Sequence, residues 1–395
     1  MATMLEIAKD CFEDLYIYSP PYITERLMAV SGCHIANLCN MLAVENKRGG
    51  ITKHGRPENL RQHCAIVIPS GFGKSTYLRS LFHDLTGLMG SQTLQTSVRA
   101  TFSKEAWLGT HLKNEGEVTT TDGIFQRFKH GIVAADEYAR LSVLMCGDGI
   151  EHDEVYLLTA LDTDMATKDL STGSIELKGI ATTIVAGMRI PHEPLAMTSG
   201  LSRRFTFELF LPTLEDSKAI KDINRNRKAA KYDMDTYRQE MEMTVRDIMD
   251  GMMHGFPTAL NYSAIEQWCD ARDIPHFEED IYKRLAVGFS VATGHFPIIS
   301  LTPELESLFN NEIGSRQVMK SNTMAEAVAR VVRGSSLRVS IAGNDYPGIP
   351  TAKVTSFFEK YYQLQTVAIR SAISGARGRG LKQDTVRGES WLFQP

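Results

Sequence analysis

Apolar residues recur with two different periods along the chain, and the changes between them outline its organisation. Residues 23–44 carry apolar side chains at helical spacing after a Pro-Pro break, so residues 1–55 are expected to form a helical region. Within residues 56–215, short apolar runs alternate with helical patterns. This alternation is typical of a parallel sheet with crossover helices and predicts an α/β fold. Residues 216–343 have helical periodicity almost throughout.

Residues 344–395 predict a small C-terminal domain. The apolar positions Val354, Phe357, Phe358 and Tyr361 follow one helical face, and a second helix repeats that spacing further on. A basic segment with the pattern of two short strands comes last. Two helices and a basic hairpin are typical of a winged helix, although a small protein-interaction module can be built in the same way.

Composition and charge exclude several classes of protein. With 395 residues, 43% of them hydrophobic, the chain is long enough for two or three domains with their own cores. The net charge of −4 hides clusters of basic residues, so it says little about a polyanionic partner. Six cysteines include no C-x-x-C pair, which argues against a disulfide framework and a zinc site. Without a leader pattern or an apolar run of about 20 residues, a cytoplasmic protein that does not enter membranes is expected.

A phosphate-binding loop is the clearest chemical motif. The apolar strand at 65–68 runs into PSGFGKST and then into a helical pattern, which is the order that such a loop requires. Two glycines let backbone N–H groups turn toward phosphate oxygens, Lys74 can reach the β- and γ-phosphates, and Ser75 can hold Mg²⁺. Ile68 replaces the first glycine of the motif, and the alternative is a glycine-rich turn with an exposed lysine. The residues expected to bind the nucleotide are Pro69, Ser70, Gly71, Phe72, Gly73, Lys74, Ser75 and Thr76.

An acidic pair at the end of a later strand supports the interpretation as a nucleotide site. Asp136 and Glu137 directly follow the apolar run at 132–135. Asp136 can hold the water shell of Mg²⁺, and Glu137 can polarise the water that attacks the γ-phosphate. An acidic strand end is common by itself, but together with the loop it predicts binding of ATP with Mg²⁺, and hydrolysis of the ATP.

A third motif, SGLSRRFTFELFLPT, places Arg203 and Arg204 directly before an apolar strand. With the two upstream motifs, it resembles the AAA+ superfamily, and within it the helicase-like group of minichromosome maintenance helicases and replication ATPases of viruses and plasmids. The resemblance implies an arginine finger that reaches ATP bound to the neighbouring subunit. Arg204 is this finger if Phe205 sets the register, and Arg203 is the finger if Ser202 does; we favour Arg204. Both arginines can instead cap a helix or pair with surface carboxylates.

Two positions bear on how hydrolysis is sensed. The resemblance covers residues 62–300 and implies a helical lid with an arginine that senses the γ-phosphate. Arg284 is the candidate, although a lone arginine on a helix is more often a surface residue. After the apolar run at 181–186, related proteins commonly have a polar sensor residue, whereas this chain has Gly187, Met188 and Arg189. This departure makes the coupling of hydrolysis to movement less certain than nucleotide binding.

Candidate DNA contacts come from two regions. The resemblance implies a β-hairpin that projects into a central channel, and here Lys168 and Lys178 flank the expected turn. In the C-terminal domain, three arginines can contact DNA phosphates: Arg370, Arg377 and Arg379. Because no nucleotide motif occurs from residue 351 onward, removal of that region is expected to lower DNA affinity and to leave ATPase activity intact.

The predicted function is that of an ATP-driven AAA+ motor, a replicative helicase or helicase-like ATPase that grips DNA inside a hexameric ring. A nucleotide-switched replication initiator or loader without translocation is one alternative, and an ATPase that remodels proteins is another. The expected location is the cytoplasm, or that of the host if the protein is viral. The expected parts are a helical N-terminal region (1–55), a P-loop AAA+ core with a parallel sheet flanked by helices (56–215), a helical lid (216–343) and a winged helix (344–395).

Overall fold

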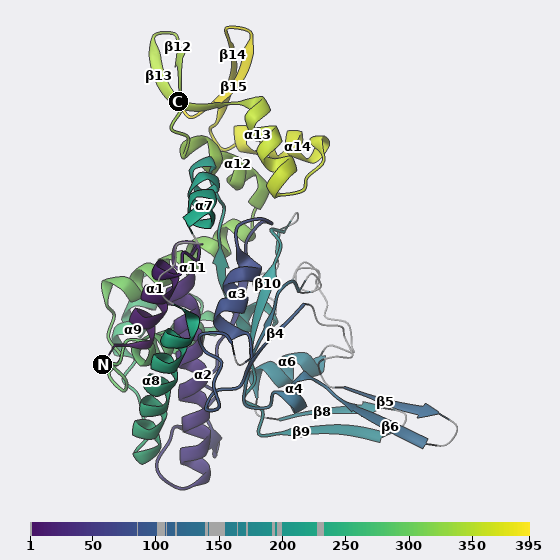
Figure 1. Cartoon of the computed structure of the whole chain (residues 1–395), viewed down its shortest axis with the longest axis vertical. Coiled ribbons are helices and arrows are strands. Elements are labelled where there is room, and N and C mark those ends of the chain that lie inside the picture. Colours follow the sequence, from purple (N-terminus) through teal and green to yellow (C-terminus); the bar gives the residue numbers. More distant parts are fainter. Residues whose placement is uncertain are drawn as a thin grey trace.

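A five-stranded, all-parallel sheet forms the centre of the computed structural model (Figure 1). The structure describes residues 2–84, 86–100, 107, 109–114, 117–138, 141, 155–163, 165–170, 173–191, 194–195, 200–226 and 233–395. The strands, in the order in which they lie side by side, are β11 (Phe205–Leu209), β3 (His63–Val67), β10 (Thr183–Met188), β7 (Ile132–Ala135) and β4 (Thr96–Arg99). The prediction of an α/β fold built on a parallel sheet is therefore confirmed.

The central strands follow from the apolar runs in the sequence. Every residue of β3, β7 and β10 is buried, as expected where helices cover both faces of a parallel sheet. The fourth predicted strand, after the arginine pair, is β11, and it is buried as well. The edge strand β4 was not predicted, because its sequence TSVR is short and half polar.

Helices from the N-terminal segment and from residues 234–319 pack together beside the sheet (Figure 1). They are α1 (Met4–Asp14), α2 (Ile23–Glu45), α8 (Met234–His254), α9 (Ser263–Asp270), α10 (His276–Ala292) and α11 (Pro303–Met319). At the crossing of α2 and α10, a Cβ on Gly32 would lie 2.1 Å from the carbonyl oxygen of Gly288, so only glycine permits this approach. The expected boundaries near residues 55 and 215 thus do not mark separately packed units.

Helix α2 corrects one expectation from the sequence. By length and composition it is apolar enough to cross a membrane, which the count of consecutive apolar residues missed. However, 89% of its most apolar window is buried inside the protein. Its neighbours α1, α8 and α10 supply that cover, so α2 has the environment of a core helix in a soluble protein.

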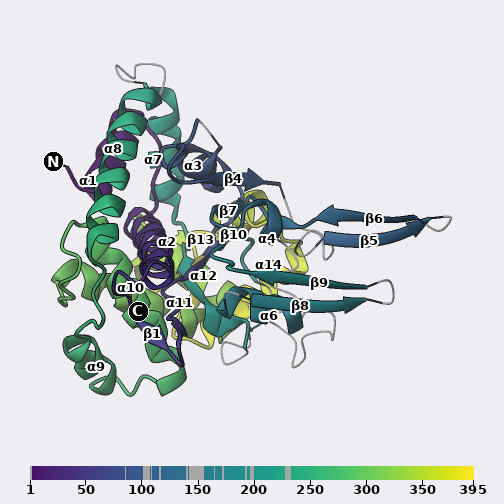
Figure 2. The ribbon, with the colours of Figure 1, turned by 90° about the horizontal axis from the view of Figure 1, so that it is seen from below.

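Two β-hairpins project from the core in the same direction and lie beside each other (Figures 1 and 2). One is formed by β8 (Met165–Leu170) and β9 (Gly173–Lys178), where the sequence predicts a hairpin, although Ser171 and Thr172 of the expected turn lie outside the described residues. The other, formed by β5 (Gly109–Asn114) and β6 (Glu117–Asp122), was not predicted. The smaller elements of the core are β1 (Thr52–Lys53), β2 (Arg56–Pro57), α3 (Lys74–Phe82), α4 (Ile124–Arg127) and α6 (Val155–Asp162).

The C-terminal unit begins earlier than the sequence suggested. Helix α12 (Thr323–Arg333) packs against α14 (Thr366–Arg377), so the expected boundary at 343/344 falls inside one packed unit. The unit also contains α13 (Thr351–Tyr361) and an antiparallel sheet of four strands in the order β12 (Arg338–Ile341), β13 (Asn344–Pro350), β15 (Glu389–Phe393) and β14 (Lys382–Val386). Helix α7 (Leu214–Asn226) lies between this unit and the core (Figure 1).

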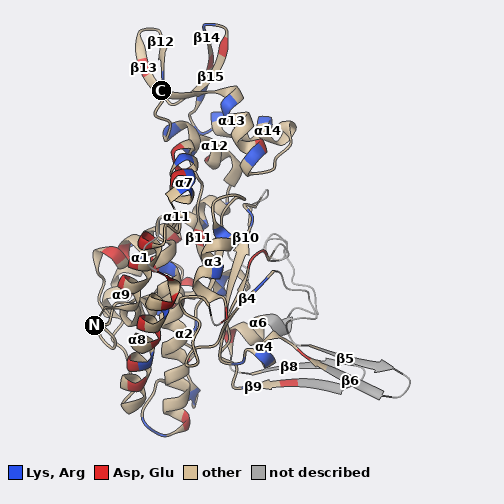
Figure 3. Cartoon of the chain, viewed as in Figure 1, with Lys and Arg blue, Asp and Glu red and all other residues tan. Residues whose placement is uncertain are grey.

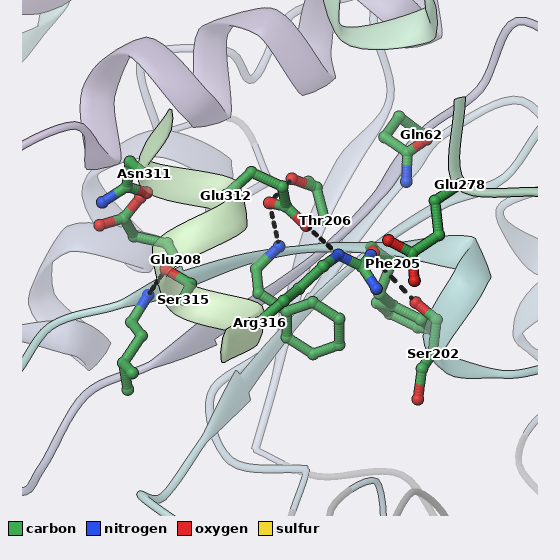
Figure 4. A network of polar contacts seen from close by, with 12 residues as sticks. Gln62, Ser202, Phe205, Thr206, Glu208, Glu278, Asn311, Glu312, Ser315 and Arg316 are labelled. Atoms are coloured by element: carbon green, nitrogen blue, oxygen red, sulfur yellow. Dashed lines mark hydrogen bonds and ion pairs between the residues drawn. The ribbon is translucent and has the colours of Figure 1, made fainter. Parts of the chain in front are cut away.

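A buried network of charges joins three parts of the molecule (Figure 4). Arg26 of α2 is fully buried, and its guanidinium donates to Glu312 of α11 at 2.6 Å and to Glu208 of β11 at 3.2 Å. Arg316 of α11 donates to the other Glu312 oxygen at 2.7 Å. Because an uncompensated charge in this interior would be very costly, α2, β11 and α11 must stay in register.

Burial raises the pKa of Glu208 from its ordinary value of 4.5 to about 7, against the lowering effect of Arg26. The folded state then holds this proton more tightly than the unfolded state, so the contribution of Glu208 to stability falls as pH rises from about 4.5 to about 7. We expect Glu208→Gln to remove this dependence. Urea unfolding of the wild type and of Glu208→Gln, at pH values across this range, measures the free energy of unfolding of each. Buried, neutral His34 makes stability change with pH in the opposite direction, but its effect is the same in both proteins and cancels in the difference. A constant difference between the two proteins would contradict the assignment.

Candidate functional site

The loop between β3 and α3 has the backbone of a phosphate-binding loop. Gly71 and Gly73 have φ angles of +86° and +80°, a region that favours glycine, and Gly73 directly precedes the first residue of α3. Ile68, which replaces the first glycine of the motif, is buried, and its N–H donates to the carbonyl of Met188 in β10 at 3.3 Å. The position therefore extends the strand, and its substitution leaves the loop that follows intact.

A cavity of about 310 Å³ opens beside this loop. One wall comes from loop and helix residues Gly71, Gly73, Lys74, Ser75 and Thr76. The other walls come from α7 and from the segment after α1, and their residues are Tyr16, Ile17, Tyr18, Ile220 and Asn224. Pro69, Ser70 and Phe72, which the sequence also assigned to the nucleotide, do not line the cavity. The aromatic contribution of Tyr16 and Tyr18 was missed, although the aromatic run YIYSPPY marks it in the sequence.

Charged side chains from three strand ends meet next to the cavity. The Lys74 ammonium donates to the carbonyl of Met188 at 3.1 Å. Burial lowers its pKa, while Glu137 and Asp136 oppose that effect, so the two carboxylates lie close enough to act on it. Arg189 forms an ion pair with Glu137 at 2.5 Å between Nε and Oε1. The parallel sheet produces this convergence, because the carboxyl ends of β3, β7 and β10 lie at the same edge.

Asp136 has the features of a ligand for a divalent cation. One carboxylate oxygen accepts from Arg79 at 3.0 Å, whereas the other, Oδ1, is buried without a hydrogen-bond partner among the described residues. An orphaned buried carboxylate oxygen is costly unless a cation or water fills the place. Ser75, exposed in the first turn of α3, offers a hydroxyl next to the same cavity. Oxygen donors of these types fit Mg²⁺.

Close backbone packing explains why the strand end at β10 departs from the usual sensor pattern. A Cβ on Gly187 would lie 2.3 Å from the carbonyl oxygen of Asp136, so a larger residue would push the acidic pair away. Tyr138 reinforces this contact by donating its N–H to Gly187 at 2.7 Å. After β10, the residue that contacts Glu137 is instead Arg189, through its guanidinium.

The two candidate finger residues have different environments. Arg204 donates to the carbonyl of Leu158 at 3.1 Å and pairs with Asp162 at 2.7 Å, and its side chain is only 18% exposed. Arg203 is exposed, and its guanidinium lies 5.2 Å from the ring centre of Phe277. The preference for Arg204 is therefore reversed, because its guanidinium already has partners within the subunit and that of Arg203 faces solvent.

The turn that carries these arginines is held by a residue that the sequence did not reveal. Arg316 donates to the carbonyls of Phe205 at 2.6 Å and Ser202 at 3.3 Å (Figure 4). These two residues bracket the arginine pair. Nothing in the sequence distinguishes Arg316 from other helix arginines, since its partners come from a strand more than a hundred residues earlier.

Arg284 lies away from the phosphate-binding loop of its own chain. It lines a second cavity, of about 480 Å³, together with Lys53, Arg56 and Arg61. Arg61 precedes the amino end of β3, whereas Lys74 follows its carboxyl end. Within one subunit the length of β3 therefore separates Arg284 from Lys74, and the role of Arg284 as a sensor of the γ-phosphate stays a prediction.

The candidate DNA contacts are distributed over two distant surfaces. On the projecting hairpin, Lys178 pairs with Met165 in the register at its base, so it does not flank the turn; its ammonium is exposed and bound to Glu176 at 2.8 Å. Lys168 is closer to the turn, opposite Ile175. The second surface is on the C-terminal unit.

Helix α14 carries basic residues (Figure 3). Arg370 and Arg377 are exposed on it, as the helical spacing predicted, and Val367 beside them is 76% exposed. Arg379 differs, because its guanidinium binds Glu326 of α12 at 3.3 Å. Two of the three arginines are therefore free to meet phosphates without first losing a partner among the described residues.

The C-terminal unit also contacts the phosphate-binding loop, which corrects another expectation. Phe72 is fully buried, with its ring centre 4.9 Å from that of Tyr361 and 6.5 Å from that of Phe357, both on α13. The expectation that removal of residues from 351 onward leaves ATPase activity intact is therefore revised, because these residues supply one side of the loop's packing.

Comparisons with known proteins add no family to this description. No protein-family model matches the chain, and no curated protein sequence is similar to it.

Proposed function

We propose that this protein is an ATP-hydrolysing motor that acts on DNA, a ring-forming ATPase of the AAA+ helicase-like kind. The observation that carries the proposal is the convergence of Lys74, Glu137 and Arg189, with the unpartnered oxygen of Asp136, beside the phosphate-binding loop. A parallel sheet with charged groups at the carboxyl ends of its strands is the usual setting for a bound phosphate. The expected location remains the cytoplasm.

Each group has a role in binding and hydrolysis. Loop N–H groups and Lys74 would hold the phosphates, and the walls from Tyr16 to Tyr18 would receive the adenine base. Mg²⁺ held through Ser75 and Asp136 would neutralise charge on the phosphates. Glu137 would accept a proton from the water whose oxygen attacks the γ-phosphorus, while the bridging oxygen leaves with ADP.

The ion pair between Arg189 and Glu137 suggests how Glu137 is kept inactive until ATP binds. In this ion pair an oxygen of the Glu137 carboxylate is occupied by the guanidinium, so it is not free to accept a proton from water. A γ-phosphate beside Lys74 carries more negative charge than Glu137 and would attract Arg189. Arg189 would then stabilise the phosphate while Glu137 becomes available to the water, which replaces the missing polar sensor.

Support for DNA as the substrate comes from the C-terminal unit and the hairpins. Three helices followed by the β14–β15 hairpin are typical of a winged helix, and α14 would be the helix that lies against DNA. The paired projecting hairpins would line the channel of a ring (Figure 2). A nucleotide-switched initiator is the second candidate, favoured by the direct contact of α13 with the phosphate-binding loop.

Two substitutions test the nucleotide site. Lys74→Ala should abolish tight ATP binding because it removes the main cation of the loop, whereas Glu137→Gln should keep binding and lower kcat by a factor of about 10² or more. Titration with a fluorescent ATP analogue and phosphate release measure the two effects. Wild-type turnover in both variants would show that the site is wrongly assigned.

The assembly is tested by mixing variants. Arg203→Ala should bind ATP normally and fail to hydrolyse it, and addition of Lys74→Ala subunits should restore part of the activity, because the latter supply Arg203 to intact loops. Arg204→Ala serves as the comparison, and should instead lower the melting temperature by removing bonds to Leu158 and Asp162. A fully active monomer in sedimentation experiments would exclude the ring.

DNA binding is tested on α14. Replacing Arg370 and Arg377 by alanine should weaken DNA binding regardless of sequence, and should reduce the slope of log affinity against log salt by about 2. Because Arg379 is bound to Glu326, its removal should change the slope less. Arg238→Ala with Arg246→Ala on α8 removes the same charge elsewhere and should leave the slope unchanged. Equal slopes for all variants would make the C-terminal unit a protein-interaction module.

A further inference from the structure

The phosphate-binding loop carries an aromatic side chain that points away from the cavity and into the C-terminal unit. Phe72, between the two glycines of the loop, is fully buried. Besides Tyr361 and Phe357, its ring contacts Phe210 at 6.0 Å between centres. Aromatic pairs at these separations stabilise beyond the area that they bury. The loop is thus anchored by a side chain whose main partners lie almost three hundred residues later.

Tyr361 contacts both walls of the nucleotide cavity at once. Its ring lies against Gly71, where an added Cβ would be 3.3 Å from Cδ1. Its hydroxyl forms a hydrogen bond of 2.6 Å with Ser217 of α7, one turn before Ile220, which lines the same cavity. One side chain therefore fixes the distance between the loop and α7.

Helix α13 is in turn packed against the helix that carries the exposed arginines. Buried Val354 and Phe358 of α13 belong to the same core as Ile369 and Ile373 of α14. Packed helices of this kind move together, because a dense core does not deform continuously. A displacement of α14 would thus be transmitted to Tyr361.

We propose that Tyr361 is a positioning residue for the phosphate-binding loop and that, through it, occupancy of α14 by DNA and of the loop by ATP favour each other. The inference rests on the proposed function. Gly71 and Gly73 allow the free loop many conformations. The aromatic ring of Tyr361 restricts them, so less conformational entropy is lost when ATP binds. DNA bound along α14 would stabilise the docked α13, and by linkage ATP would raise DNA affinity by the same factor.

The first experiment separates positioning from general stability. Tyr361→Ala should raise the Kd for ATP by about tenfold and leave kcat at saturating ATP within about twofold, since the catalytic groups are untouched. Tyr361→Phe keeps the ring and should restore most of the affinity. The matched control is Tyr346→Ala, which removes an equally half-buried ring that packs on Phe393 within the same unit; it should leave the Kd for ATP unchanged.

The second experiment measures the coupling in the full chain with a duplex oligonucleotide. In the wild type, DNA should lower the Kd for ATP several-fold, and ATP should lower the Kd for DNA by the same factor. In Tyr361→Ala both factors should fall to about 1, while DNA binding without nucleotide stays unchanged because α14 is intact.

The outcomes distinguish this inference from the proposed function. A wild-type protein that binds no ATP would refute the proposed nucleotide site and this inference with it. If the wild type binds ATP and Tyr361→Ala binds it equally well, positioning by Tyr361 is refuted while the proposed function stands. A Tyr361→Ala variant that loses ATP affinity but keeps full coupling to DNA would confine Tyr361 to the loop and refute the link to α14.

Discussion

The buried charge of Arg26 is the constraint on which the arrangement of the molecule depends. A guanidinium shielded from water must be surrounded by acceptors, and those acceptors come from β11 and α11, far from α2 in sequence. Glu312 shares its two oxygens between Arg26 and Arg316. An error in the placement of any one of these elements would leave a charge without compensation, so the network selects one packing of the N-terminal helices, the sheet and the later helices.

The same network contacts the turn that carries the candidate finger residues, through Arg316. Arg316 is fixed by Glu312 and in turn holds the carbonyls on either side of Arg203 and Arg204. An arginine finger that contacts a phosphate on another subunit needs to sit on a rigid turn. If the turn were mobile, the entropy lost in ordering it would cancel the energy gained from the contact. The interior charges thereby connect the stability of the fold to the proposed contact between subunits.

The cavity beside the phosphate-binding loop is formed by segments from three parts of the chain. Its floor is the loop after β3, one wall comes from the N-terminal segment around Tyr16, and another comes from α7. Behind the loop, Phe72 is held by α13. The shape of a site assembled from so many segments changes when any of them shifts. Binding to one of these segments can therefore alter the site directly, without a series of intervening residues.

The parts of this protein that depend on the local order of residues could be predicted from its sequence. Buried strands appear as apolar runs, and the loop motif requires only a strand before it and a helix after it, so β3, β7 and β10 were predicted correctly. Lys74 and the acidic pair follow β3 and β7, as the order of the motifs in the sequence indicates. The β5–β6 hairpin and β4 were not predicted, because these segments are short or mixed in polarity. Their strand structure depends on pairing with neighbouring strands, which the local sequence does not show.

Which arginines are exposed and which are bound could not be predicted, because it depends on contacts between distant segments. Arg203 and Arg204 are adjacent and chemically identical, yet Asp162 and the carbonyl of Leu158 occupy one of them and leave the other exposed. Arg284 fits a helical pattern in the sequence, but its helix lies at the far end of β3. The contact of Phe72 with Tyr361 was invisible for the same physical reason: it joins residues distant in sequence, and an apolar residue in a glycine-rich loop does not reveal which core it will enter.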